Sequence, residues 1–260
     1  GAQKTEDLFS SIPVNVRLKG GIKIDNGKSE IEVRNTVCGI SRKNNVYKSC
    51  FLGAGVYNHY IPSVVSKIAS TQEFVTAYTP YQAEISQGVL QAIFEYQTYI
   101  CELTGMEASN ASVYDGATAL AEACMMTRTN SRNKVLLSEG VNPEYLKVIK
   151  TWSTYAGLDI DFIKLTDYKT DLADLKAKLK DDVAGVVIQS PNFYGTIEDM
   201  KSYEGTIHDN KSLFISVVNP ISLAVLQSPA EYSADIAVGE GQPLGTPMSN
   251  GGPYLGFMAA

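Results

Sequence analysis

A short turn between an apolar run and a helix-forming run carries the clearest chemical signal in the sequence. The apolar run Ala111–Tyr114 ends at Asp115-Gly116, and residues that favour helices follow it. The first amides of such a helix have no partner within it, and together with the helix dipole they attract phosphate. The small side chains of Gly116 and Ala117 leave these amides accessible, and Thr118 adds a hydroxyl. The pattern therefore indicates a phosphate-binding turn, with an ordinary strand-to-helix turn as the alternative.

The elements that must position this turn alternate between strands and helices along the rest of the chain. The expected strands are Ser109–Val113, Lys134–Ser138, Asp159–Lys164, Val183–Gln189, Leu213–Val218, Asp235–Gly239 and Tyr254–Ala259. The expected helices between them are Gly116–Thr127, Pro143–Ala156, Asp171–Lys180 and Asp199–Asp209. The run Val183–Ile188 is apolar throughout, as a strand covered on both faces should be. The alternation predicts an α/β fold with a mainly parallel seven-stranded sheet between helices.

The first part of the chain is polar and irregular, and we expect it to form an arm with a few helices. Ser29 and Glu32 have the spacing of a capping box, which predicts a helix that runs to about Arg42. A second helix is expected from Pro62, and a long amphipathic helix is expected to stop at Gly105. The expected division is an arm with helices over residues 1–75 and a large α/β domain over residues 76–260.

A loop rich in aromatic and polar residues precedes the long helix. It contains Tyr78, Thr79, Pro80, Tyr81, Gln82 and Glu84. Such side chains in a proline-stiffened loop suit donation to the binding site of a partner. The alternative is a loop that only contacts another subunit.

Composition excludes several other classes of function. The chain is 44% apolar and 19% charged, typical of a globular protein with a substantial core. Its net charge of −6 argues against a nucleic-acid partner, and no apolar run reaches the length of about 20 residues that a membrane span needs. The sequence begins without the apolar region of a signal peptide, so we expect a cytoplasmic protein. The scattered cysteines and the two histidines, His59 and His208, predict neither a metal site nor a catalytic triad.

Eight motifs are spread over nearly the whole chain. They are Phe51–Pro62, Ala77–Gly88, Ile93–Gln97, Cys101–Met106, Tyr114–Ala121, Pro191–Gly195, Gly241–Gly245 and Asn250–Pro253. In this order they closely resemble the P-protein family (glycine dehydrogenase, decarboxylating) of the glycine cleavage system, and in particular subunit 1 of its two-subunit form. The resemblance implies the fold of type I pyridoxal-phosphate enzymes, in a chain that lacks the family's smaller C-terminal domain.

The resemblance also implies a function. The family is an oxidoreductase of glycine catabolism that decarboxylates glycine and passes the aminomethyl group to the lipoyl arm of the H-protein. In the two-subunit form, a heterotetramer, pyridoxal phosphate is expected on subunit 2, near its contact with subunit 1. We therefore expect this chain to bind no cofactor itself and to work with subunit 2, the lipoylated H-protein and glycine.

Three positions support that division of labour. Pyridoxal phosphate needs a lysine for its Schiff base and a carboxylate at its pyridine nitrogen. Aligned with the catalytic subunit, this chain has Gln242 at the lysine position, Ser216 at the carboxylate position and Asn142 where the family usually has histidine. We therefore expect no catalytic residue in this chain alone, and we interpret the turn at residues 115–118 as a vestigial phosphate site.

Two other functions remain open from the sequence. The chain would be a pyridoxal-phosphate enzyme active by itself if it supplied a lysine to the cofactor, and Lys201 and Lys211 are too distant in the predicted topology. It would otherwise be a fragment that serves a structural role in another assembly.

Overall fold

The structure is a computed structural model that describes residues 1–49, 51, 58–75, 78–80 and 87–260. It has two compact units, residues 1–52 and residues 53–260. The division expected from the sequence, an arm of residues 1–75 and a large domain of residues 76–260, remains a prediction.

The first unit contains short helices and no buried side chain among its described residues. Its helices are the 3-10 helices η1 (Thr5–Phe9) and η2 (Val14–Val16) and the α-helix α1 (Glu30–Ser41). The predicted capping box is confirmed, because the Glu32 carboxylate accepts hydrogen bonds from the Ser29 amide at 2.9 Å and from its hydroxyl at 2.6 Å.

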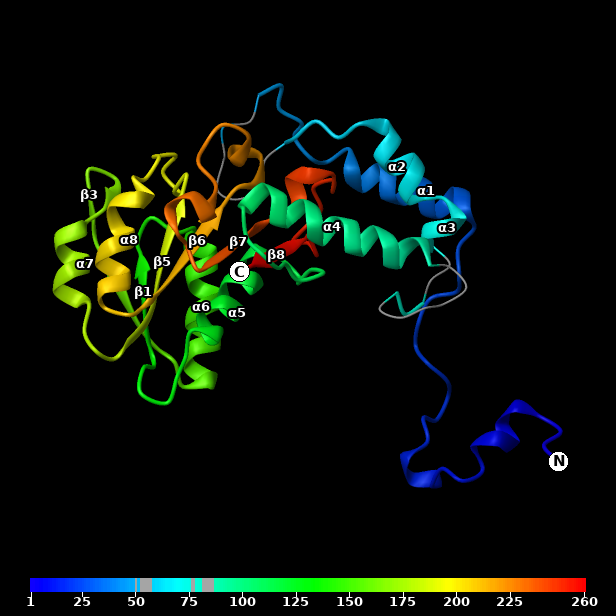
Figure 1. Cartoon of the computed structure of the whole chain (residues 1–260). Coiled ribbons are helices and arrows are strands. Elements are labelled where there is room, and N and C mark those ends of the chain that lie inside the picture. Colours follow the sequence, from blue (N-terminus) through cyan, green and yellow to red (C-terminus); the bar gives the residue numbers. More distant parts are fainter. Residues whose placement is uncertain (50, 52–57, 76–77, 81–86) are drawn as a thin grey trace. The chain divides into compact units, whose positions relative to one another are not determined.

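The second unit is a mixed sheet with helices on both faces (Figure 1). Its main sheet has the order β2-β1-β5-β6-β7-β8, and only β8 runs antiparallel to its neighbour. The strands are β1 (Lys134–Ser138), β2 (Asp159–Ile163), β5 (Val183–Ser190), β6 (Leu213–Val218), β7 (Ile236–Glu240) and β8 (Gly256–Ala259), with a separate hairpin of β3 (Leu165–Thr166) and β4 (Lys169–Thr170). The helices are α2 (Ser63–Ala69), α3 (Gln72–Val75), α4 (Gly88–Thr104), α5 (Gly116–Met126), α6 (Pro143–Ala156), α7 (Leu172–Lys178) and α8 (Met200–Asp209), with the 3-10 helices η3 (Pro220–Ala224), η4 (Pro229–Tyr232) and η5 (Gln242–Leu244).

Successive residues of the central strands supply two separate cores, one on each face of the sheet. Val135 and Leu137 of β1 pack in a cluster with residues of α5 and α6. Leu136, which lies between them, packs instead with Leu175 of α7 and Ile207 of α8. Val186, Val187 and Ile188 of β5 alternate between the two cores in the same way, and nearly all of β5 is buried, which confirms the prediction of a strand covered on both faces.

Six of the seven expected strands form, and the seventh is reduced to isolated bridges. Ser109 bridges Ala259, and Val113 bridges Gly256, both antiparallel to β8. The sequence also missed the hairpin of β3 and β4, whose strands are too short to carry an alternating pattern.

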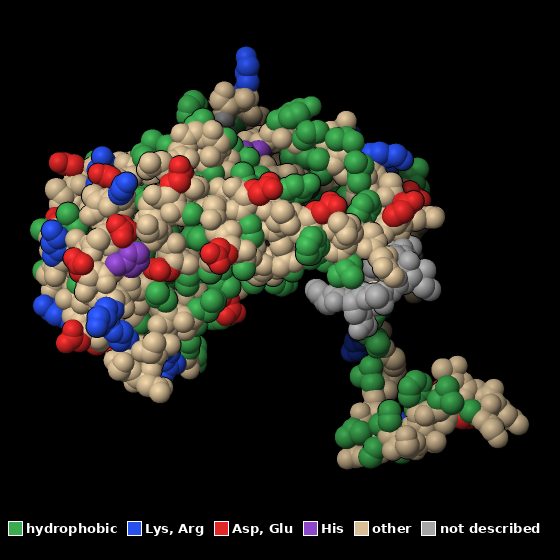
Figure 2. Space-filling model, viewed as in Figure 1, with side chains coloured by type: hydrophobic (Ala, Val, Ile, Leu, Met, Phe, Trp, Pro, Cys, Tyr) green, Lys and Arg blue, Asp and Glu red, His purple; other side chains and the backbone are tan. Residues whose placement is uncertain are grey.

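Charged side chains of both signs are interspersed on the visible face of the sheet and its helices, so that face carries no basic stripe (Figure 2). In the part of the chain that the structure describes, no helix combines the length and the apolarity that crossing a membrane requires. The same residues contain no group of three or more potential metal ligands.

A histidine on α8 joins that helix to the segment before β7. The His208 ring lies 2.9 Å from an Asp235 oxygen through Nε2 and 3.1 Å from a Glu204 oxygen through Nδ1. Partial burial acts to lower the pKa of His208, but the two carboxylates together outweigh it and hold the pKa above its ordinary value.

We expect the stabilising effect of His208 to depend on pH. Because its folded-state pKa is raised, the contribution is fully present below the unfolded pKa of about 6.5 and is lost as the pH rises through the higher folded value. His208→Asn should therefore lower the free energy of unfolding by a few tenths to about 1 kcal/mol more near pH 6 than near pH 9. Urea denaturation at both pH values measures the difference, and equal losses would contradict it.

Candidate functional site

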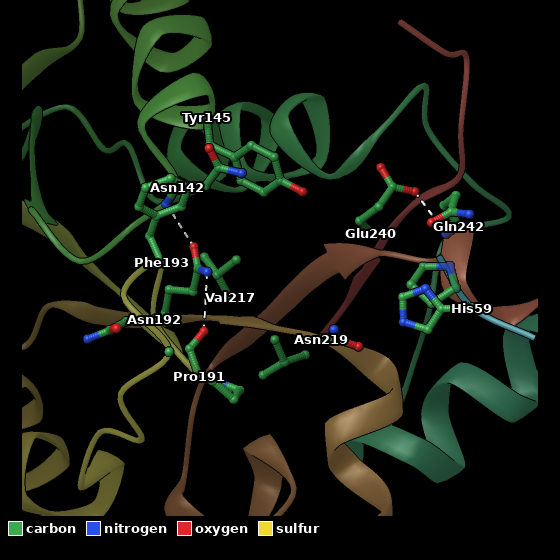
Figure 3. A pocket seen from close by; sticks show the side chains of 14 residues that line it. His59, Asn142, Tyr145, Pro191, Asn192, Phe193, Val217, Asn219, Glu240 and Gln242 are labelled. Carbon is green, nitrogen blue, oxygen red and sulfur yellow. Dashed lines mark hydrogen bonds between the residues drawn. The ribbon is translucent and has the colours of Figure 1, made fainter. Parts of the chain in front are cut away.

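A cavity of about 280 Å³ opens at the carboxyl ends of β5, β6 and β7, where the start of α6 also lies (Figure 3). Ligands of open α/β sheets bind at this edge, because the strand ends and the helix starts meet there. The cavity is lined by His59, Asn142, Tyr145, Gln189, Pro191, Asn192, Phe193, Gly195, Val217, Val218, Asn219, Glu240, Gln242 and Pro243.

The start of α6 brings Asn142 to the cavity. Its side-chain oxygen accepts a hydrogen bond from the Glu144 amide at 2.9 Å, so Asn142 caps the helix and Pro143 occupies the first helical position. The backbone amide of Asn142 donates a hydrogen bond to the Gln189 side-chain oxygen at 2.9 Å, which connects the helix to the end of β5. Asn142 is thus a structural cap that borders the cavity, and its amide group offers no ring to stack on a cofactor.

The buried carboxylate of Glu198 holds the turn after β5 in place. Glu198 accepts hydrogen bonds from Asn192 at 3.0 Å, from Tyr203 at 2.9 Å and from the Thr170 amide at 3.1 Å. Burial raises the pKa of Tyr203, and the Glu198 charge adds to the effect. The Asn192 oxygen in turn accepts from the Tyr194 amide at 3.0 Å, so the whole turn is held rigidly at the cavity wall.

Ser216 lies outside the cavity. It is fully buried in β6, and its hydroxyl hydrogen-bonds the Tyr232 hydroxyl at 2.8 Å. Because side chains alternate along a strand, the neighbouring residue that lines the cavity is Val217. Neither residue is a carboxylate, so β6 offers no partner for a pyridinium nitrogen at either position.

Gln242 does line the cavity, and it is buried. Its side-chain nitrogen donates to the Thr246 carbonyl, which stabilises the turn of η5. An amide is not a nucleophile and cannot form a Schiff base.

The predicted turn at the start of α5 forms, but carboxylates accept hydrogen bonds from two of its amides, those of Gly116 and Thr118. Asp115 accepts hydrogen bonds from both the amide and the hydroxyl of Thr118 at 2.7 Å, which makes it the helix cap. The Gly116 amide donates to Glu240 at 3.0 Å, and Ala117 is buried. Sequence analysis missed Glu240, Tyr145 and His59 as residues of the site. Glu240 directly precedes the Gly241–Gly245 motif, and that position was the available signal.

The aromatic loop before α4 is described only in part. Tyr78, Thr79 and Pro80 are described, and none of them lines the cavity. Tyr81, Gln82 and Glu84 lie outside the described residues.

The residues of the cavity do not fit pyridoxal phosphate. The lining contains no lysine or arginine among the residues that the structure describes. Lys147 lines an adjacent hollow that shares Asn142, Tyr145 and Glu240 with the cavity, and its ammonium group lies 2.7 Å from Glu144. No chemical step through the cofactor is therefore assigned to this chain.

Known proteins of one family match this chain over its whole length. The family model of the glycine cleavage system P-protein matches residues 1–260. A relative from Anoxybacillus flavithermus, named probable glycine dehydrogenase (decarboxylating) subunit 1, is 49% identical over 262 residues, and one of the same name from Syntrophomonas wolfei is 50% identical over 262 residues. These alignments cover 100% of this chain but only 58% and 60% of the relatives, so the chain spans about three fifths of their length.

Solved structures give the same picture. A crystal structure of glycine decarboxylase (P-protein) of the glycine cleavage system, in inhibitor-bound form, superposes with a TM-score of 0.92 at 44% identity and covers 100% of this chain and 59% of that one. A cysteine desulfurase from Thermococcus onnurineus superposes with a TM-score of 0.58 at 16% identity, over 76% of this chain and 50% of that one, and shows the fold alone. The expected α/β fold of type I pyridoxal-phosphate enzymes is confirmed.

Proposed function

The chain belongs to the glycine cleavage system P-protein family, and from this premise we propose that it is the non-catalytic subunit of a pyridoxal-phosphate-dependent glycine decarboxylase. In this proposal the cofactor sits on a second subunit, and this chain completes and scaffolds the active site of that partner. Glycine is decarboxylated there, and the aminomethyl group passes to the lipoyl group of the H-protein. The cytoplasm remains the proposed compartment, and a heterotetramer the proposed assembly.

The cavity at the carboxyl ends of the strands is the observation that carries the proposal. A chain that performed the chemistry itself would need a lysine in this cavity, and the position expected for it holds Gln242, whose amide is committed to Thr246. Phosphate would need the amides at the start of α5, and carboxylates accept hydrogen bonds from two of them. A family fold without cofactor chemistry is best explained by a role in assembly.

The exposed aromatic residues of the long helix α4 favour a contact with a partner subunit. It buries Ile100 and Thr104, yet Phe94 and Tyr99 on the same helix are 66% and 58% exposed. Large aromatic side chains at a surface are typical of contact sites between proteins. We propose that the aromatic loop of residues 78–84, which precedes α4, reaches the cofactor pocket of the partner.

The cofactor experiment follows directly. Incubated with pyridoxal phosphate, the purified chain should stay colourless, because no lysine lines the cavity among its described residues. Borohydride reduction followed by peptide mapping should show only scattered surface adducts. Lys147 is the lysine to inspect, since it lines the adjacent hollow, and Lys147→Arg is the control. A stoichiometric adduct at any single lysine would make the non-catalytic role untenable.

A second measurement separates the subunit role from a structural fragment. Co-purification of the tagged chain with the pyridoxal-phosphate subunit of the same system should recover a complex that decarboxylates glycine. If the two subunits are mixed in equal amounts and the tagged chain is recovered without the pyridoxal-phosphate subunit, the result would favour a structural role in another assembly.

A further inference from the structure

We propose that Glu240 is a built-in anion that fills the start of α5 and keeps phosphate-bearing ligands out of this end of the cavity. The inference goes beyond the proposed subunit role and does not depend on it. The contacts of this one carboxylate concern the phosphate end of the misfit between the chain and the cofactor of its fold family.

The Glu240 carboxylate collects three backbone amides from three segments. One oxygen accepts from the Gly116 amide at 3.0 Å, and the other accepts from the Gln242 amide at 2.9 Å and from the Leu255 amide at 3.0 Å. Figure 3 shows Glu240 beside Gln242 at the edge of the cavity. Several amides that converge on one anion at the start of a helix are the arrangement by which proteins hold phosphate. Here the anion comes from the chain itself, from a residue 124 positions away from Gly116.

In the described part of the chain, the cavity around this carboxylate is lined by no lysine or arginine, and Glu240 takes part in none of the ion pairs of Lys134, Lys147, Lys178 and His208. Burial raises the pKa of Tyr96 to about 12, and the Glu240 charge adds to the effect. Burial and the same charge also raise the pKa of Tyr145. The amides and the helix dipole therefore supply the stabilisation of the Glu240 charge.

The surrounding side chains close tightly over this contact. A Cβ added at Gly116 would lie 2.4 Å from the Tyr145 hydroxyl oxygen and 3.1 Å from the Glu240 Cβ. The space above the first amide of α5 is thus already taken. A phosphate group would have to displace the carboxylate and would meet the charge of Asp115 beside it.

Removal of the carboxylate should open an anion site. In Glu240→Ala, the Gly116, Gln242 and Leu255 amides lose their acceptor, and inorganic phosphate or acetate can take its place. Titration of the whole chain, followed by the amide resonances of these residues, should show saturable shifts in the variant. Phosphate affinity should be at least about tenfold higher than in the wild type, the factor that corresponds to about 1.4 kcal/mol. Saturation should also raise the melting temperature of the variant. The matched control is Glu102→Ala, which removes an exposed carboxylate from α4 and should respond like the wild type.

Two results would overturn the proposal. One is a wild-type chain whose Gly116 amide responds to phosphate as strongly as that of Glu240→Ala. The other is a folded Glu240→Ala chain, by circular dichroism, that shows no saturable response to either anion.

Glu240→Gln keeps the shape of the side chain and covers the case in which the alanine variant does not fold. In the wild type the Gly116 amide proton donates to a carboxylate, whereas in Glu240→Gln it would face a neutral amide, so its resonance should move upfield relative to amides far from the cavity. A Gly116 resonance at the same position in both chains would show that the carboxylate does not act on α5.

Discussion

Gly256→Ala should lower the free energy of unfolding by about 3 kcal/mol or more. An added Cβ would lie 2.0 Å from the carbonyl oxygen of Asp115 and 2.7 Å from Val113 Cγ2. The backbone cannot retreat cheaply, because Gly256 and Val113 exchange two backbone hydrogen bonds of 2.9 Å. The same Asp115 carbonyl accepts from the Ala119 amide at 2.9 Å, so any shift also disturbs the first turn of α5.

Gly205 provides the matched control for this substitution. It lies exposed in α8, and a Cβ added there would meet nothing within 4 Å. Gly205→Ala should raise the free energy of unfolding by about 0.5–1 kcal/mol, since alanine is the better helix former. Urea denaturation followed by circular dichroism compares the two variants. If Gly256→Ala unfolds at the same urea concentration as the wild type, Gly256 of β8 does not lie in close contact with the Asp115 carbonyl at the start of α5.

If the loop lines the partner's cofactor pocket, as we propose, Tyr81→Phe and Glu84→Gln should each lower glycine turnover of the reconstituted two-subunit complex by about 5- to 150-fold. A lost transition-state hydrogen bond of roughly 1–3 kcal/mol accounts for that range. From the sequence, a proline at position 80 fixes its own backbone angle and biases Thr79 toward an extended shape, and we expect successive side chains of an extended segment to point in alternate directions. One of Tyr78 and Tyr81 can then pack on this subunit while the other reaches the partner.

The measurement needs both a rate and an assembly readout. The variants should form the complex with normal affinity, so that the loss appears in turnover. Tyr155→Phe on α6 and Glu102→Gln on α4 remove the same groups from exposed positions and should leave the rate unchanged. Wild-type turnover in both loop variants, with assembly intact, would reduce the loop to a contact surface.

The sequence alone determined those elements whose signals are local. Helix α6 has the predicted bounds Pro143–Ala156, because Asn142 caps its first turn and Gly157 adopts a left-handed conformation at its end. The bounds of β1 and β6 were also predicted correctly, since buried strands of a parallel sheet are mainly apolar. The family was recognisable for a related reason, because short motifs keep their order along the chain.

Only the tertiary structure decided what surrounds the start of α5. The local sequence predicted open amides there, and a carboxylate 124 residues away covers one of them. It also decided the face of Ser216, because a displacement of one residue along a strand moves a side chain to the opposite side of the sheet. The segment 109–113 had the composition of a strand, yet only Ser109 and Val113 bridge β8. Pairing and charge contacts between distant segments depend on the assembled sheet, and a local pattern of residues contains no information about them.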